Sequence, residues 1–259
     1  MPIADDPGRA DGRLITDRGG RTVARFFEQE RDGRPFADLL ELVDGIAVGE
    51  AVPVLKAELA GWRLAAPAPL GEALIAAGGR PRRHAHVMSR DLVRDPAPAA
   101  WLEPPAPAGI QLTPVDRPAA ELADAVIAAY PAEHPDYKDI PDPQNPAEEL
   151  ADLMDGKILG PLLRASGLAV HEDGTVAGAV FVNGSGGEPP FGGPWISQIF
   201  RHTSAKGVGE PLLRRALAIA TRDGLPAVGL AVTHANAGAM ALYARNGFAD
   251  VLESVGVEL

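Results

Sequence analysis

The chain has 259 residues, of which 46% are hydrophobic, and this is enough to bury one large core or two smaller ones. The formal net charge of −11 argues against non-specific binding of nucleic acid, and the lack of cysteine excludes disulfides, thiolate metal sites and a cysteine nucleophile. No segment approaches the ~20 apolar residues of a membrane span. The acidic, polar start of the chain is unlike a signal peptide, so we expect a cytoplasmic protein.

Residues 1–93 predict a small N-terminal α/β domain. Residues 22–29 favour a strand, whereas 35–43 and 49–57 are ambiguous, and 61–92 predict a strand, a short helix ended by glycine, and another strand. His84 and His86 alternate onto one face of that last strand. Two histidines without a third ligand near them in the sequence do not predict a metal site, so no metal is expected.

A run rich in proline and alanine, residues 94–108, predicts a stiff and extended linker. It separates the N-terminal domain from a larger C-terminal domain, residues 109–259. Within that domain, Asp173-Gly174 is a strong turn signal between two predicted strands. The predicted order is strand 110–115, helix 119–129, a proline-rich loop at 130–146, helix 147–155, strands 168–171, 175–182 and 195–201, helix 212–223, strand 227–232, helix 237–245 and a final strand.

The most informative segment is 195–209, WISQIFRHTSAKGVG, in which a strand runs through a short basic loop to a pair of glycines. Pro211 lacks an N–H and fits the first turn of the helix that follows. The N–H groups of residues 206–210 should therefore be free to bind phosphate oxygens, and Gly207 and Gly209 allow a ligand to approach the backbone closely. A dinucleotide fingerprint would need glycine where Leu212 stands, and a Walker A loop would need lysine where Glu210 stands.

A second motif follows about thirty residues later, in AVTHANAGAMALYARNGF. Asn236 is a good N-cap and Gly247 a good C′ residue, so they bracket a helix at 237–245. Asn236 and Tyr243 are seven residues apart, and seven steps of ~100° return them to nearly the same helix face, ~10 Å apart along the axis.

Together the two motifs resemble the GCN5-related N-acetyltransferase (GNAT) superfamily over residues 109–259. The family's loop reads Arg/Gln-x-x-Gly-x-Gly/Ala, and here Ser204 replaces its first residue. The resemblance implies an α/β (α+β) fold, in which helices flank a mixed, mostly antiparallel sheet. Residues 61–92 look like the closing unit of the same fold without either motif, which suggests that the N-terminal half-domain is a degenerate GNAT-like unit.

The resemblance implies acetyl-CoA as cosubstrate and Tyr243 as the general acid at its sulfur. Asn236 would contact the pantetheine arm. Each of these two residues also has a structural explanation, since Tyr243 could anchor the helix and Asn236 could simply cap it. The expected coenzyme-binding residues are Ile199, Phe200, Arg201, Ser204, Ala205, Lys206, Gly207, Val208, Gly209, Glu210 and Asn236.

A local group of basic residues suits a polyanion such as coenzyme A, with a solvated arginine face as the alternative for Arg215 and Arg222. The group consists of Arg201, Lys206, Arg214, Arg215 and Arg222. Glu210 would repel phosphate unless it points aside. With Ser204, it keeps open a second class of function, a coenzyme-binding, sensing or interaction protein with little catalysis.

The general base is not evident, because residues 194–201 contain no acidic side chain where family members often carry glutamate. Deprotonation through water is an alternative to a protein base. Substitute candidates are His202, Glu133, His134, His171 and Glu188.

The expected function is therefore direct, acetyl-CoA-dependent N-acetylation of an amine on a small molecule or peptide, by a monomer or homodimer that binds neither nucleic acid nor membrane. The segment 130–164 is expected to line the acceptor cleft, and its carboxylates would attract a cationic amine unless they only solubilise the surface. Those carboxylates are Glu133, Asp136, Asp139, Asp142, Glu148, Glu149, Asp152 and Asp155, against Lys138, Lys157 and Arg164.

Overall fold

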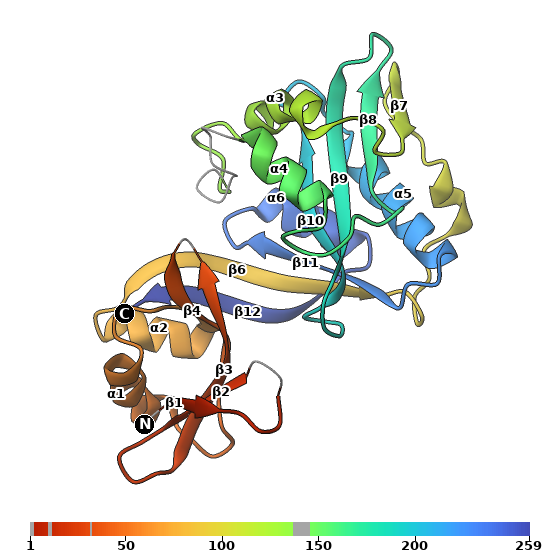
Figure 1. Cartoon of the computed structure of the whole chain (residues 1–259). Coiled ribbons are helices and arrows are strands. Elements are labelled where there is room, and N and C mark those ends of the chain that lie inside the picture. Colours follow the sequence, from red (N-terminus) through yellow and green to blue (C-terminus); the bar gives the residue numbers. More distant parts are fainter. Residues whose placement is uncertain (1–2, 10–11, 32, 137–145) are drawn as a thin grey trace. The chain divides into compact units, whose positions relative to one another are not determined.

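A computed structural model describes residues 3–9, 12–31, 33–136 and 146–259 (Figure 1). The chain forms two compact units, and the division does not follow chain order. The first unit combines Met1–His86 with Leu252–Leu259, and the second contains Val87–Val251. None of the helices in the described part of the chain is long and apolar enough to cross a membrane.

The second unit carries most of the predicted elements. Its strands β7 to β10 pair antiparallel in sequence order, and β10 pairs in parallel with β11. The helices are α3 Ala119–Ala129, α4 Pro146–Met154, α5 Gly209–Arg222 and α6 Ala237–Arg245. The strands are β7 Ile110–Thr113, β8 Gly167–His171, β9 Val176–Ser185, β10 Gly193–Arg201 and β11 Ala227–Thr233.

Two hydrophobic clusters cover the two faces of this sheet, because successive side chains of a strand point to opposite faces. Along β9, Val180 and Val182 pack in the cluster of α5, whereas Ala179 and Phe181 pack in the cluster of α3 and α4. The helices accordingly lie on opposite sides of the sheet in Figure 1. Helix α5 begins at Gly209, three residues earlier than the predicted 212, since Pro211 is compatible with the first turn.

The proline- and alanine-rich segment 94–108 belongs to the second unit. Ala97 is buried in the core of that unit, and Ala99–Leu102 forms a short 3₁₀ helix. The ring of Trp101 lies near two guanidinium groups, with Arg90 5.2 Å and Arg214 5.0 Å from its centroid. Cation–π contacts of this kind fix the segment against the second unit.

The first unit repeats the closing part of the second on a smaller scale. Strands β4 and β5 pair in parallel at Phe36↔Arg63 and Ala37↔Leu64, and helix α1 connects them. The order β2-β3-β4-α1-β5-α2-β6 matches β8-β9-β10-α5-β11-α6-β12. The elements of the first unit are β1 Ile3–Asp5, β2 Gly12–Thr16, β3 Thr22–Arg31, β4 Arg34–Leu42, α1 Val48–Glu58, β5 Arg63–Pro67, α2 Ala68–Ala76, part of β6 Arg80–Asp91 and part of β12 Ala249–Glu258.

This repeat is reduced in two ways. Only six residues separate β1 from β2, so the described first unit has no counterpart of α3 and α4. The junction between β4 and α1 also lacks a close pair of glycines, because Gly45 and Gly49 are four residues apart whereas Gly207 and Gly209 are two apart. The mixed, mostly antiparallel fold with a degenerate N-terminal copy, predicted from the sequence, is therefore confirmed.

The closing strands of the two repeats are exchanged between the units. Strand β12 follows α6 in the chain, yet its residues Ser254–Glu258 pair with Arg63–Pro67 of β5. Val255 and Val257 are buried in the core of the first unit. In return, β6 follows α2, but Met88 and the next residue beyond the strand, Leu92, are buried in the core of the second unit.

Candidate functional site

The site begins where β10 and β11 separate. The two parallel strands pair only at Trp195↔Gly229 and Ile196↔Leu230, and a bulge interrupts β10 between Ile196 and Gln198. A Cβ at Gly229 would lie 2.6 Å from the Trp195 ring, so glycine is needed for the indole to cross there. Beyond this point, main-chain groups on the facing edges of β10 and β11 are not paired with each other.

A buried amide holds the bulge in place. The Ser197 hydroxyl donates to Asn183 Oδ1 at 2.7 Å, and the Asn183 side-chain amide donates to the carbonyls of Leu153 and Gly160 at 3.0 and 2.9 Å. Asn183 is fully buried. The network fixes the bulge relative to the segment after α4 and sets the direction of the next side chain, Gln198.

The loop after β10 leads into α5 with its amide groups free. Ala205 and Val208 are buried and anchor the loop, and Gly207 adopts a φ of +84°. The first helical bond runs from the Leu212 N–H to the Val208 carbonyl at 3.2 Å. Within the described residues, the N–H groups of 206–210 donate to no acceptor. Such a group of N–H donors at a helix N-terminus favours an anion.

Glu210 lies in the first turn of α5 but points aside, as phosphate binding would require. Its carboxylate accepts hydrogen bonds from Arg245 Nε at 3.1 Å and Asn246 Nδ2 at 3.2 Å, and it pairs with Arg214 Nη2 at 2.9 Å. The Arg245 hydrogen bond, with smaller effects of Asn246 and Arg214, lowers the pKa of Glu210. The charge of Glu210 is thus compensated by α5 and α6.

The basic group predicted from the sequence is only partly available to a ligand. Arg215 donates to the Thr113 carbonyl, Arg222 contacts Asp223, and Arg214 contacts Trp101 and Glu210. Lys206 and Arg201 remain exposed on the loop, although Arg201 donates to the carbonyls of His202 and Thr203. Ser204 stands where the family has arginine or glutamine. Its hydroxyl oxygen lies 2.6 Å from His202 Nδ1.

Helix α6 brings the second motif to the same region. Asn236 Oδ1 accepts from the Ala239 N–H at 3.1 Å, which is the expected N-cap, and Asn236 Nδ2 donates to Asp136 Oδ2 at 2.9 Å. Tyr243 is 6% exposed, and its ring lies 5.7 Å from that of Phe248. The segment after α3 and the start of α6, 100 residues apart, therefore meet through Asp136 and Asn236.

Two tyrosines interact electrostatically beside Asp136. Burial raises the pKa of Tyr130 to about 12, although a hydrogen bond with Gln198 opposes the shift and Asp136 adds to it. Burial also raises the pKa of Tyr243, with further contributions from Tyr130 and Asp136. Both hydroxyl groups consequently stay protonated and can donate hydrogen bonds at neutral pH.

Two oxygen atoms at this place are buried without a hydrogen-bond partner among the described residues, Asp136 Oδ1 and Gln198 Oε1. A buried acceptor without a donor costs roughly 1–3 kcal/mol, so such groups are rare unless a ligand supplies the donor. An ammonium or amine group carries N–H donors of the required kind.

Sequence reasoning does not single out Tyr130 or Gln198 as site residues. It includes Asp136 among the eight carboxylates of the segment expected to line the acceptor cleft, without assigning it a role of its own. Gln198 does carry a signal, because it is the one long polar side chain among residues 195–200. Asp136 carries none, since the loop around it is rich in acidic residues throughout.

The substitute bases occupy different places. His134 accepts from the Asp136 N–H at 3.1 Å and packs edge-on to Tyr130, with ring centroids 4.9 Å apart. His202 contacts Ser204 in the phosphate loop. Glu133 and Glu188 are exposed, and His171 ends β8. Of the predicted acidic rim, Asp152 and Asp155 pair with Lys157, whereas Lys138, Asp139 and Asp142 lie outside the described residues.

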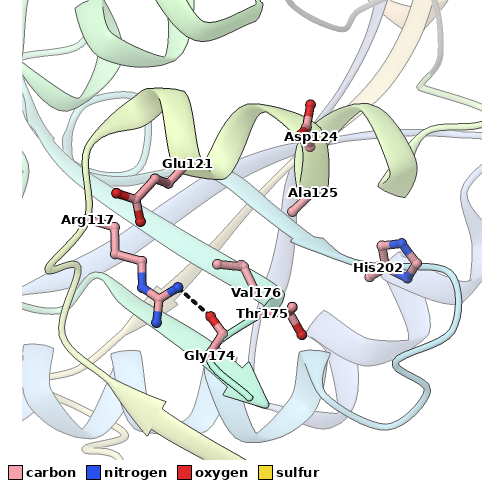
Figure 2. A pocket seen from close by; sticks show the side chains of 8 residues that line it. All are labelled: Arg117, Glu121, Asp124, Ala125, Gly174, Thr175, Val176 and His202. Carbon is pink, nitrogen blue, oxygen red and sulfur yellow. Dashed lines mark hydrogen bonds between the residues drawn. The ribbon is translucent and has the colours of Figure 1, made fainter. Parts of the chain in front are cut away.

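Figure 2 shows a groove on another part of the second unit, between α3, the β8–β9 turn and His202. Arg117 donates a hydrogen bond to the Gly174 carbonyl, so part of its hydrogen-bonding capacity is already used. The groove contains two carboxylates, one arginine and one histidine. Its lining includes neither Tyr243 nor the glycine pair. Its lining residues are Arg117, Glu121, Asp124, Ala125, Gly174, Thr175, Val176 and His202.

Part of the chain is similar in sequence to a known family. Residues 121–248 match the family model of the acetyltransferase (GNAT) family. None of the curated proteins matches the chain. Members of this family are generally N-acetyltransferases that use acetyl-CoA.

Solved structures show the same fold over nearly the whole chain. A GCN5-related N-acetyltransferase from Sphaerobacter thermophilus is 19% identical with a TM-score of 0.61, and the match covers 96% of this chain and 80% of that one. A tandem GNAT protein from the clavulanic acid biosynthesis pathway is 18% identical with a TM-score of 0.56, covering 96% and 82%. The fold is thus that of the GNAT acetyltransferases. The match to the GNAT family model covers just under half of the chain and lies within its second unit.

Proposed function

We propose that the protein is an acetyl-CoA-dependent N-acetyltransferase that transfers the acetyl group directly to an amine. The observation that carries the proposal is the arrangement around the separated ends of β10 and β11. A loop of free amides follows one strand, and a helix with Asn236 and the buried Tyr243 follows the other.

The coenzyme is proposed to bind along β10 and its loop. The N–H groups of residues 206–210 would bind the pyrophosphate. Ile199 and Phe200 pair with β9 on one side, and their backbone on the edge that faces β11 would bind the pantetheine arm. Lys206 and Arg201, exposed on the loop, would add positive charge at the phosphates. Asn236 would contact pantetheine while it caps α6.

The acceptor amine is proposed to bind between Asp136 and Gln198, whose buried oxygens lack donors among the described residues. Asp136 would accept a proton from the amine, whose nitrogen then attacks the thioester carbonyl. As the C–S bond breaks, the Tyr243 hydroxyl would donate its proton to the leaving thiolate, and the second proton that the nitrogen loses as the amide forms would restore the phenol. The products are the acetylated amine and coenzyme A, and no acyl-enzyme is needed.

The proposed acceptor is a primary amine on a small molecule or peptide that is cationic when free. A positive charge is favoured next to Asp136, and the carboxylates of the surrounding segment add a negative field. The predicted alternative, a coenzyme-binding protein without turnover, uses the same loop but does not require the acceptors at Asp136 and Gln198.

The experiment that tests the proposal has two stages. Calorimetry with acetyl-CoA measures coenzyme binding, and a thiol-release screen over amines, polyamines, amino acids and aminoglycosides measures transfer. Saturable binding with release of coenzyme A in the presence of an amine supports the enzyme. Binding without any amine-dependent release would support the sensing alternative, and no binding would contradict both.

Gly209→Val is expected to reduce acetyl-CoA binding below detection by calorimetry while the protein stays folded. A Cβ at Gly209 would meet only the end of the Leu242 side chain, at 3.8 Å, so the protein itself has room for it. The valine side chain would instead keep phosphate from the amide groups.

The matched control for this prediction is Gly49→Val. Gly49 occupies the first turn of α1, the counterpart of α5 in the first unit, and a Cβ there meets nothing within 4 Å. This variant should bind acetyl-CoA as the unmodified protein does. Unchanged affinity in Gly209→Val would show that the phosphates bind elsewhere.

A further inference from the structure

Three potential metal ligands meet in the first unit. His84 and His86 lie two residues apart on β6 and therefore share one face of the strand. Their rings stack with centroids 6.0 Å apart. Glu253, from the exchanged strand β12, reaches the same place, with its Oε1 2.8 Å from His84 Nε2.

The strand register explains why these residues meet. Arg82 contacts Glu258, and His84 contacts Glu253. Higher residue numbers on β6 therefore lie beside lower residue numbers on β12, so the two strands run antiparallel. A Cβ at Gly256 would lie 3.1–3.2 Å from the Arg83 backbone, which places residues 83 and 256 opposite each other. Counting along the ladder puts Glu253 opposite His86, with their side chains on the same face.

We propose that His84, His86 and Glu253 form a binding site for a divalent transition-metal ion of the Zn²⁺ type. One ligand atom from each residue lies within 4.8 Å of the others. Tetrahedral coordination at metal–ligand distances of about 2.0–2.2 Å separates ligand atoms by roughly 3.3 Å, so small side-chain rotations suffice. Two imidazoles and one carboxylate suit zinc, whereas Mg²⁺ and Ca²⁺ prefer sites made of oxygen ligands alone.

This site could not be predicted from sequence spacing, because Glu253 lies 169 residues from His84. The expectation of no metal rested on the missing third ligand, and β12 supplies it. In the absence of metal, His84 and Glu253 form a hydrogen-bonded pair. A bound ion would replace that contact and cross-link β6 to β12 within the first unit, which would hold the end of the chain in place.

The test uses the full-length chain without a histidine tag, freed of metal with EDTA. Zn²⁺ is titrated in competition with a chromophoric chelator, and thermal unfolding is followed with Zn²⁺, with Mg²⁺ and with EDTA. We expect one equivalent of Zn²⁺ to bind and to raise the Tm by several degrees, whereas Mg²⁺ leaves the Tm unchanged. A ligand that binds only the folded state must raise its stability.

Glu253→Gln and His84→Gln should each weaken Zn²⁺ binding at least tenfold and abolish the Zn²⁺-dependent rise in Tm. His171→Gln, at the end of β8 in the second unit, is the control and should behave like the unmodified protein. Equal Zn²⁺ binding in all variants, or no binding to the unmodified protein, would overturn the proposal. If a variant fails to fold, the visible spectrum of Co²⁺ bound to the unmodified protein decides, because a hexaaqua-like spectrum would exclude imidazole ligands.

Discussion

Asp136→Asn is expected to lower kcat for amine acetylation about 10³-fold, the largest effect anticipated for a single substitution in this protein. The reason is that asparagine cannot accept the proton of the acceptor amine, a step that general base catalysis accelerates by roughly 10²–10⁴-fold. An asparagine oxygen can still accept the hydrogen bond that Asn236 Nδ2 donates to Asp136 at 2.9 Å. Binding of acetyl-CoA and the Tm should therefore change little.

The measurement is steady-state release of coenzyme A with the best amine from the screen, beside calorimetry with acetyl-CoA. Glu133→Gln is the matched control, because Glu133 lies three residues earlier in the same segment and is exposed. It should retain nearly full activity. If Asp136→Asn turns over normally, the proton leaves through another group or through water, and the assignment of Asp136 is wrong.

Tyr243→Phe is expected to lower kcat about 10²-fold with little change in thermal stability. Phenylalanine keeps the packing against Phe248 and removes only the hydroxyl that would protonate the leaving thiolate. Because burial raises the pKa of Tyr243 above its ordinary value of 10.0, the hydroxyl remains protonated below that pH. The unmodified enzyme should accordingly show no loss of kcat from phenol ionisation as the pH rises from 7 to 10.

Tyr130→Phe provides the comparison for this prediction. Tyr130 interacts with Gln198 and lies near Tyr243, but no transfer step is assigned to it, so its loss should cost less than tenfold in kcat. A fall in Tm with unaltered turnover for Tyr243→Phe would instead mean that this tyrosine only anchors α6 to the sheet.

Local signals were sufficient to predict most of the elements of the second unit. Helices at 119–129 and 237–245 have the predicted bounds, the first after Pro118 and the second between Asn236 and Gly247. Capping residues, prolines and glycines act through the backbone next to them, so one sequence reveals them. The same applies to the glycine pair at the start of α5.

The composition of the cluster around Tyr243 could not be predicted in this way. The position of Gln198 depends on a bulge in β10, and a bulge held by Ser197 and a buried Asn183 has no local sequence pattern. Asp136 meets Asn236 through tertiary contact across 100 residues. Strand pairing also could not be predicted, because the alternation of apolar and polar side chains indicates a strand but not which strand lies next to it.

The exchange of closing strands has a consequence for how the protein is made. At about 5–20 residues per second, the ribosome adds Leu252 roughly 8–33 s after His86. For that interval the nascent first unit lacks the strand that covers the edge of β5 and contributes Val255 and Val257 to its core. The edge is therefore open to chaperones and to other nascent chains until β12 has been synthesised. Translation that stops before Leu252 would leave residues 1–86 without the strand that completes their sheet, although all of those residues had been made.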